Sequence, residues 1–337
     1  MAFETGVSTS PSNLLGLLQN RLNTDGWTIV RSNGLAESGS SQQLSFSDPG
    51  VAEGNQYNIV AYDSPAATAR WAWQPSTGDS GVSTNFYAHT GTPAASATPS
   101  NFCTFGNAHN SAGDQGFSGA SIAYFFFSGQ TPAGARYCHV VVEGTAGVYF
   151  HMWFGTIQKA GSFTGGQYAT SLHVSTAGIA MWPGQHNPGG GAGTQWTRFD
   201  NFASSGSPGW REMNWGVSNN SGTSQFAGLY QGGLDAISQR TPFCPIFATF
   251  WENNNPTVNS SRYVIAGHLP DVMQCSMDGR EPGEIVTLGS DDWRIFPMHR
   301  KTTDGLSVTT LAYTNTNVAG PAPNNDSNLQ GLAYRET

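Results

Sequence analysis

The chain has 337 residues, which is enough for one large hydrophobic core or two modest ones. Charged residues make up only 11% of it, less than half of the roughly 25% that is typical of globular proteins. The net charge is −8 and no cluster of Lys or Arg residues occurs, so the composition argues against binding to nucleic acid or to an anionic membrane.

One helix is predicted near the N-terminus. Ser10 is a suitable N-cap, and Pro11 is tolerated in the first turn. The apolar face consists of four leucines at helical spacing, Leu14, Leu15, Leu18 and Leu22. Gly26 is the expected left-handed stop, and a strand over residues 27–30 follows it. These residues lack the basic start and continuous apolar run of a signal peptide, and no apolar run long enough for a membrane-spanning helix occurs.

Short strands separated by turn residues are predicted after the helix. They lie at 43–47, 56–62, 70–74, 84–89, 120–127, 137–143, 148–154, 171–174, 178–182, 247–252, 263–266, 284–288, 293–297, 306–313 and 331–335. Many short strands and a single helix predict a mainly β fold, with β-sandwich-like sheets and long ordered loops. A secreted β-protein would have the same composition, and the lack of a signal segment disfavours that alternative.

Two long stretches, residues 75–119 and 183–246, are rich in Gly, Ser, Thr, Asn and Pro. Loops of this length inside a compact domain are usually functional or interfacial. Tryptophans punctuate the second stretch, which indicates order rather than disorder. We therefore expect a single β-rich structural unit over residues 1–337, with residues 183–195 as the best candidate for an internal boundary.

The four cysteines do not form a recognisable metal-binding pattern. They are Cys103, Cys138, Cys244 and Cys275, and no two of them make a CxxC pair. Because aromatic residues flank them, we expect small buried hydrophobic side chains, and structural disulfides are the alternative.

Residues 138–154 form the strongest hairpin signal, since two runs of β-branched and aromatic residues flank a small-residue turn. A four-residue loop at 144–147 would pair Val140 with His151 and would send His139 and His151 to opposite faces of the sheet. That register disfavours a metal site between the histidines, whereas a one-residue bulge would bring them to the same face. We expect packed, hydrogen-bonded histidines and no bound metal.

The hairpin continues into a glycine-punctuated loop that carries the pattern HxxFGxxxKxGxxTGGxY. The residues of this motif that we single out are His151, Phe154, Gly155, Lys159, Gly165, Gly166 and Tyr168. The pattern resembles structural proteins of tailed-bacteriophage particles. Residues 11–31, 267–297 and 331–335 are similar to the same family and occur in the same order along the chain.

The resemblance implies a structural component of the virion, associated with the tail at its baseplate, its tip or its neck. It implies that the chain assembles as a homo-oligomer in the host cytoplasm and docks to other tail or neck proteins. The low charge density suits such a role, because charged side chains are expensive to bury in an interface. The resemblance carries no catalytic residue and no cofactor.

Lys159 is the one charged residue in the loop 155–168. It could hold a carboxylate such as that of Glu143, or a neighbouring chain across an interface. A solvated lysine is the plainer interpretation, and the sequence leaves both open.

An alternative function rests on four tryptophans, Trp182, Trp196, Trp210 and Trp215. Aromatic faces stack on sugar rings, so these residues could bind host-surface glycan in a receptor-recognition protein at the tail tip. Hydrolysis of such a glycan would need two suitably spaced carboxylates, for which Asp200 and Glu212 are the nearest candidates. Packing of the tryptophans inside the fold is the plainer interpretation.

Motifs of common enzymes are missing from the sequence, including the GxSxG elbow, the phosphate-binding GxxxxGK[ST] loop and HExxH. Residues 116–119 approach the elbow and miss it by one position. We therefore predict that the protein is not an enzyme.

Acidic and basic residues alternate near the C-terminus. The acidic residues are Asp278, Glu281, Glu284, Asp291 and Asp292, and the basic ones are Arg280, Arg294, Arg300 and Lys301. We expect interleaved salt bridges on a surface or at a rim between subunits, and a Ca²⁺ site is the alternative because oxygen ligands are plentiful.

Overall fold

The computed structural model confirms a mainly β fold, with several antiparallel sheets and one helix in the part that it describes. The described residues are 1–33, 42–51, 56–63, 70–76, 103–105, 121–145, 148–162, 166–171, 173–174, 180–181, 197–200, 210–213, 226–231, 243–252, 262–277, 280–297 and 330–337. The predicted strands at 84–89 and 306–313 lie outside them.

The central sheet, called sheet A here, has the strand order β1-β7-β8-β9-β11-β14-β15. Its strands are β1 (Ala2–Ser8), β7 (Ile122–Gln130), β8 (Arg136–Thr145), β9 (Val148–Thr156), β11 (Gln167–Ser171), β14 (Thr197–Asp200) and β15 (Trp210–Met213). All neighbouring strands in it are antiparallel. The predicted hairpin 138–154 is its centre, because β8 and β9 pair there.

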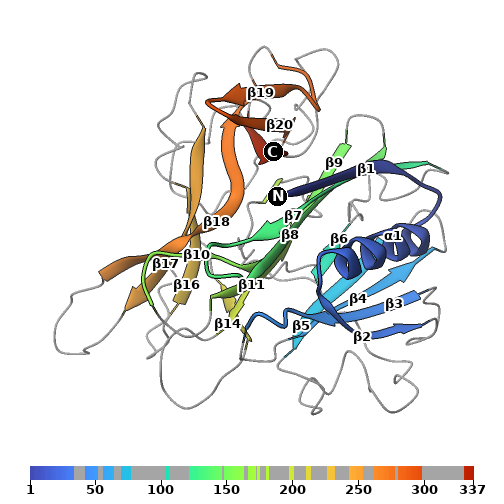
Figure 1. Ribbon diagram of the computed structural model, residues 1–337, viewed down its shortest axis with the longest axis horizontal. Helices are drawn as coiled ribbons and strands as arrows, with labels where there is room; N and C mark the ends of the chain where they lie inside the picture. The colour runs from blue at the N-terminus through green and yellow to red at the C-terminus, as the bar shows by residue number, and fades with distance from the viewer. Residues whose placement is uncertain are drawn as a thin grey trace, which may run out of the picture.

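The second sheet, sheet B, has five antiparallel strands in sequence order. They are β2 (Thr28–Asn33), β3 (Gln42–Ser47), β4 (Gln56–Tyr62), β5 (Arg70–Ser76) and β6 (Cys103–Phe105). Helix α1 (Pro11–Thr24) covers it, as Figure 1 shows on the right.

The C-terminal sheet, sheet C, has the strand order β16-β17-β18-β21-β20-β19. Its strands are β16 (Phe226–Gln231), β17 (Cys244–Glu252), β18 (Arg262–Ser276), β21 (Gln330–Arg335), β20 (Asp291–Pro297) and β19 (Ile285–Leu288). The short strand β10 (Gln158–Lys159) also pairs with β18, and β12 (His173–Val174) pairs separately with β13 (Ala180–Met181).

The ends of the helix are as the sequence predicts. The Ser10 hydroxyl accepts a hydrogen bond from the backbone N–H of Asn13 at 3.1 Å, and Pro11 occupies the first turn. After Asp25, Gly26 adopts a φ of 77°, which glycine adopts without the steric cost that a side chain imposes. The four predicted leucines are buried.

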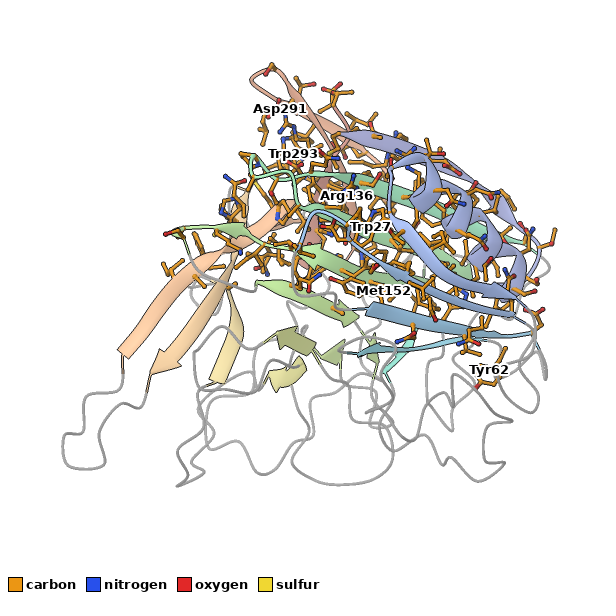
Figure 2. All side chains as sticks on the ribbon, turned by 60° about the horizontal axis from the view of Figure 1, so that its bottom comes forward. Trp27, Tyr62, Arg136, Met152, Asp291 and Trp293 are labelled. Carbon is orange, nitrogen blue, oxygen red and sulfur yellow. The ribbon has the colours of Figure 1, made fainter. Side chains whose placement is uncertain are left out.

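Two hydrophobic cores lie on opposite faces of sheet A. The first lies against helix α1 and sheet B and contains the helix leucines, Trp27, Phe46 and Met152. In Figure 2, Trp27 and Met152 lie in this interior. The second core lies against sheet C and contains Trp153, Tyr334 and other buried aromatic and aliphatic residues. Sheet A is therefore the shared middle layer of the described part, which agrees with the sandwich-like expectation.

Several strands were not predicted from the sequence, namely β1, β6, β10, β14, β15 and β16, and β11 shares only Ser171 with the strand predicted at 171–174. They are short, or, like β1, they carry Gly and polar residues that weaken the strand pattern. Strand β1 forms because all seven of its residues pair with β7, which is more than 110 residues away in the sequence.

Candidate functional site

The hairpin β8–β9 places both histidines of the motif region on the same face of sheet A. His139 pairs with Trp153, and Val141 pairs with His151, so all four side chains face sheet C. The register that we predicted from a four-residue loop is therefore wrong by one residue. The physical reason is an irregularity between Glu143 and Thr145, which adds one residue to β8.

His151 is completely buried, and both of its ring nitrogens are hydrogen-bonded. Its Nε2 lies 3.0 Å from the carbonyl oxygen of Pro297, which can only accept, so Nε2 carries the proton. The Nδ1 of the neutral ring then accepts from the Tyr334 hydroxyl at 2.6 Å. That hydroxyl oxygen accepts in turn from the Trp153 indole N–H at 2.8 Å. In this chain of three hydrogen bonds, the donor of each bond is therefore fixed: His151 Nε2, the Tyr334 hydroxyl and Trp153 Nε1.

His139 is also completely buried, and a single hydrogen bond joins it to sheet C. Its Nε2 donates to the carbonyl oxygen of Pro270 at 2.7 Å. Its Nδ1 has no hydrogen-bond partner within the described part of the chain. His139 is thus held by one directional contact and by ring packing against Tyr137 and Trp153.

Burial keeps both imidazoles neutral. Desolvation lowers the pKa of His139 to about 4, although the Pro270 carbonyl and Asp271 act in the opposite direction. Desolvation also lowers the pKa of His151 to about 3, against the smaller opposing effect of the Pro297 carbonyl. At neutral pH neither histidine carries charge, and neither is placed to exchange a proton with solvent.

A third polar contact joins the sheets beside the histidines. The Tyr137 hydroxyl donates to Asp271 Oδ2, and Arg335 approaches the other carboxylate oxygen at 3.3 Å. Asp271 is the one non-glycine residue with positive φ in the described part, at 52°, a conformation that Asp tolerates better than most residues. Its unusual backbone directs the carboxylate toward sheet A. We call Tyr137, His139, His151, Asp271 and Tyr334 the inter-sheet polar layer.

The described residues contain no group of three or more His, Cys, Asp or Glu side chains placed to hold a metal ion. Three of the four ring nitrogens of the two histidines already bond protein oxygens, and the fourth, Nδ1 of His139, is buried without a hydrogen bond in the described part. Within the described residues, the layer joins sheet A to sheet C through hydrogen bonds that buried side chains make with other side chains and with backbone carbonyls.

Phe154 lies on the opposite face of sheet A from His151. Its ring packs among Phe46, Tyr57 and Trp27, with centroids 5.2, 5.5 and 5.7 Å away, and it is completely buried. The motif therefore connects the two cores, because His151 faces one of them and Phe154 faces the other.

Gly155 is required at its position for two reasons. Its φ is 130°, and a Cβ would lie 2.3 Å from the Cα of Tyr137 and 2.5 Å from the carbonyl oxygen of Arg136. Its own carbonyl oxygen accepts a hydrogen bond from the Tyr57 hydroxyl at 3.1 Å. The absent side chain allows β8 and β9 to approach here, and no rotamer change could relieve contacts with backbone atoms.

The remaining motif residues are dispersed along the next strands. Lys159 lies in β10, where its backbone pairs with Gly267 of sheet C. Gly166 has a φ of 98°, and its carbonyl oxygen accepts from the N–H of Ile157 at 3.0 Å. Tyr168 is completely buried and pairs with Gly155 across β9 and β11, whereas Gly165 lies outside the described residues.

The tryptophans of the glycan alternative are mostly outside the described part. Trp182, Trp196 and Trp215 are not among the described residues, so whether these side chains lie close together is not tested. Trp210 begins β15, where its backbone pairs with Asp200 of β14.

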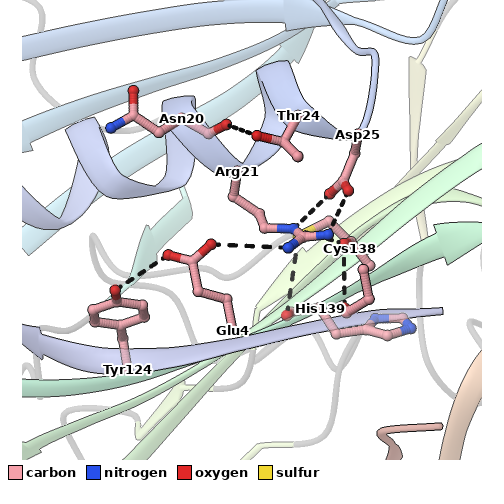
Figure 3. A network of polar contacts seen from close by, with 10 residues as sticks. Glu4, Asn20, Arg21, Thr24, Asp25, Tyr124, Cys138 and His139 are labelled. Carbon is pink, nitrogen blue, oxygen red and sulfur yellow. Dashed lines mark hydrogen bonds and ion pairs between the residues drawn. The ribbon is translucent and has the colours of Figure 1, made fainter.

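An arginine network that the sequence did not reveal fixes the helix to sheet A (Figure 3). Arg21 donates from Nε to Asp25 at 2.8 Å and to the Ser128 hydroxyl of β7 at 3.1 Å. The Glu4 carboxylate of β1 lies 3.9 Å from Nη1 of Arg21. The Arg21–Asp25 spacing of four residues was the one sequence signal for it. The long-range partners required the fold.

A second arginine joins sheet A to sheet B. Arg136 donates to the fully buried carboxylate of Asp48 from its backbone N–H at 2.7 Å and from its guanidinium at 3.0 Å. It also donates to the carbonyl oxygen of Asp25 at 2.9 Å, which satisfies a free carbonyl at the helix end. No sequence pattern links these residues.

The C-terminal acidic region forms salt bridges, and one of them, Arg280–Glu284, joins two residues of the predicted set. The pairs are Arg280–Glu284 at 3.4 Å, Arg294–Glu336 at 2.6 Å and Arg335–Asp291 at 3.1 Å. Asp278, Arg300 and Lys301 lie outside the described residues.

Three of the cysteines can be assessed in the structure. Cys138, Cys244 and Cys275 are free thiols, and Cys138 and Cys275 are buried as expected. Burial raises the pKa of the Cys275 thiol to about 12, so it is protonated at neutral pH.

Comparison with known proteins gives no further information on identity. No protein-family model matches the chain, and no curated protein sequence matches it significantly. Within the described residues, no helix is long and apolar enough to cross a membrane.

Proposed function

We propose that this chain is a structural component of a tailed-phage virion. It belongs to the tail region, at the baseplate, tip or neck, and assembles as a homo-oligomer that docks to neighbouring virion proteins. The sequence motif of residues 151–168 is the source of this proposal. The observation that carries it is the position of His151, Phe154 and Gly155, which connect the cores on the two faces of sheet A.

A fixed angle between two sheets is useful in a protein whose surfaces must match those of neighbouring subunits. Hydrogen bonds have preferred directions, so the polar layer fixes the angle between sheets A and C more narrowly than apolar contacts alone. Gly155 allows β8 and β9 to pack closely at the same place. The mechanism we propose is therefore geometric, in which a rigid centre holds outer strands and loops in position for neighbouring subunits.

The test is to determine whether the chain is part of a phage particle. An antibody raised against the purified chain is applied to gradient-purified particles by immunoblot and by immunogold electron microscopy. The proposal predicts that the chain sediments with the particles and that gold lies at the tail region. Particles that contain none of the chain, while it accumulates in the soluble fraction, would contradict it.

A second candidate is a glycan-binding receptor protein at the tail tip. The four tryptophans within residues 182–215 favour it. It predicts that the purified protein binds host-surface polysaccharide on a glycan array and that a Trp196→Ala phage adsorbs poorly. If the protein bound no glycan on the array and the Trp196→Ala phage adsorbed normally, this candidate would be excluded.

A further inference from the structure

Strand β21 has an unusual place in sheet C. It is the last strand in sequence, yet it lies between β18 and β20 in the middle of the sheet. In the described part of the chain, the hairpin of β19 and β20 joins the rest of sheet C through β21 alone. The space between β18 and β20 is therefore a slot for one strand (Figure 1, top).

The slot recognises β21 through both backbone and side chains. Residues 330–334 pair with β18, and residues 331–335 pair with β20. Leu332, Ala333 and Tyr334 are completely buried, and the Tyr334 hydroxyl bonds His151 and Trp153 of sheet A. At the edge of the slot, Arg335 contacts Asp291 at 3.1 Å. The contacts specify this strand and its register.

The connection between β20 and β21 is far longer than the pairing needs. Pro297 at the end of β20 lies directly opposite Gly331 of β21, and antiparallel strands at that distance are commonly joined by two to five residues. Here residues 298–329 separate the two strands. A connection of this many residues could reach at most about 110 Å if it were fully extended, so its length alone does not confine β21 to its own chain.

We propose that, in the assembled oligomer, the slot of one copy receives β21 of a neighbouring copy. This inference rests on the homo-oligomer of the proposed function and names the contact that forms it. Each slot–strand contact made between copies equals the one seen within the chain, so exchange sacrifices none of these bonds. Exchange that runs head to tail closes a ring when the rotation between subunits permits.

The register supplies a covalent test. Cys275 lies opposite Gly331, and a Cβ placed on Gly331 would be 3.2 Å from the Cys275 Sγ. One tagged copy keeps Cys275 and Gly331, and a second, differently tagged copy carries Cys275→Ser and Gly331→Cys. After co-expression and oxidation with oxidised glutathione, strand exchange predicts a disulfide-linked dimer that contains both tags on a non-reducing gel.

The control is a co-expression in which both copies carry Cys275→Ser and only one carries Gly331→Cys. Any dimer seen there comes from the other cysteines. The Cβ added at Gly331 would also lie 2.7 Å from the side chain of Met277, which could disturb the packing. A second pair therefore repeats the test two residues along the same strands, with Met273→Cys on one copy and Ala333→Cys on the other. Circular dichroism checks that each variant is folded.

The outcomes separate the inference from the function that it rests on. A mixed-tag dimer with either pair, above the control, supports exchange between copies. An oligomer by mass photometry in which neither pair links the tags, while a single chain with Cys275 and Gly331→Cys forms an internal disulfide, overturns exchange and leaves the homo-oligomer. A folded monomer by mass photometry overturns both.

Discussion

The cores on the two faces of sheet A differ in composition, although buried polar contacts such as Arg136–Asp48 and Tyr57–Gly155 also join sheet A to sheet B. Toward helix α1 and sheet B, the core is made largely of leucines and aromatic rings such as Phe46 and Phe154. Toward sheet C, it contains two buried histidines whose hydrogen bonds cross to Pro270, Pro297 and Tyr334. Apolar packing supplies stability without a preferred direction, whereas the polar layer also fixes orientation.

The two sides of sheet A should therefore be sensitive to different substitutions. The helix side should respond to changes of volume, because buried apolar groups are stabilised by packing. The sheet C side should respond to changes of proton occupancy and hydrogen bonding as well, because an unpaired buried polar group costs free energy.

Replacement of Gly155 should have the largest effect, because both sides of sheet A depend on it. In Gly155→Val the side chain meets backbone atoms of β8, and the φ of 130° is disfavoured for valine. We expect no soluble folded protein and no plaques from a phage that carries the change. Gly161→Val is the matched control, because a Cβ at Gly161 meets nothing within 4 Å. Equal titres of the two variant phages would contradict the role of Gly155.

Acidification should be the next largest effect and should act on the sheet C side. The folded-state pKa values of His139 and His151, about 4 and about 3, lie below the ordinary value of 6.5. The unfolded chain therefore binds protons first as the pH falls, so stability is complete above pH 6.5 and is lost progressively toward pH 4 and 3. The total loss is several kcal/mol, since each pH unit of such a difference is worth about 1.4 kcal/mol.

Urea unfolding followed by near-ultraviolet circular dichroism between pH 7.5 and 5 measures this effect. In that range most exposed carboxylates remain ionised, so the histidines dominate. Tyr137 packs against His139, and Asp271, which pairs with Arg335, acts to raise the His139 pKa. His268, whose pKa is lowered by burial, contributes in the same direction as the two histidines. A free energy of unfolding that stays constant from pH 7.5 to 5 would contradict the buried neutral state of the histidines.

Phe154→Ala should destabilise the helix side by about 3–5 kcal/mol, the usual cost of truncating a buried aromatic side chain. Phe154→Leu keeps most of the volume and should cost less than about 2 kcal/mol. Chemical denaturation at neutral pH measures both. Similar costs for the two variants would show that the aromatic cluster around Phe154 is not closely packed.

Tyr334→Phe should cost about 1–3 kcal/mol, because His151 Nδ1 and Trp153 Nε1 both lose the hydroxyl they bond. Tyr124→Phe is the matched control on the other side, since its hydroxyl bonds the partly exposed Glu4 at 3.2 Å. We expect its effect to be below about 1 kcal/mol. A larger effect for Tyr124→Phe than for Tyr334→Phe would reverse the contrast between the two sides.

The smallest effect is expected at the Arg280–Glu284 salt bridge, just before β19. Arg280→Ala removes a salt bridge to Glu284 between side chains that are about a third exposed. Solvent screens such pairs, so the expected cost is at most about 1 kcal/mol. A loss as large as that of Tyr334→Phe would assign this region a structural role that the geometry does not support.

The sequence predicted features that depend on neighbouring residues. The cap at Ser10, the leucine face of the helix and the stop at Gly26 follow from local rules, and each was confirmed. The strand predicted at 56–62 coincides with β4 for the same reason.

Features that depend on distant partners could not be predicted. A bulge near Glu143 changed the register of the hairpin, and no pattern of alternating residues reveals such an insertion. The bonds of Arg136 to Asp48 and of His151 to Tyr334 connect residues 88 and 183 positions apart. Only the pairing of the sheets brings these groups together, so single-sequence reasoning identified the histidines but not what they bond.

If this chain is a rigid building block that assembles with copies of itself, the purified protein should be an oligomer, and mass photometry at neutral pH tests this most directly. We predict one discrete species at a small multiple of the monomer mass, such as a trimer or a hexamer. A monomer that persists at micromolar concentration, with the circular dichroism of a folded β-protein, would contradict it.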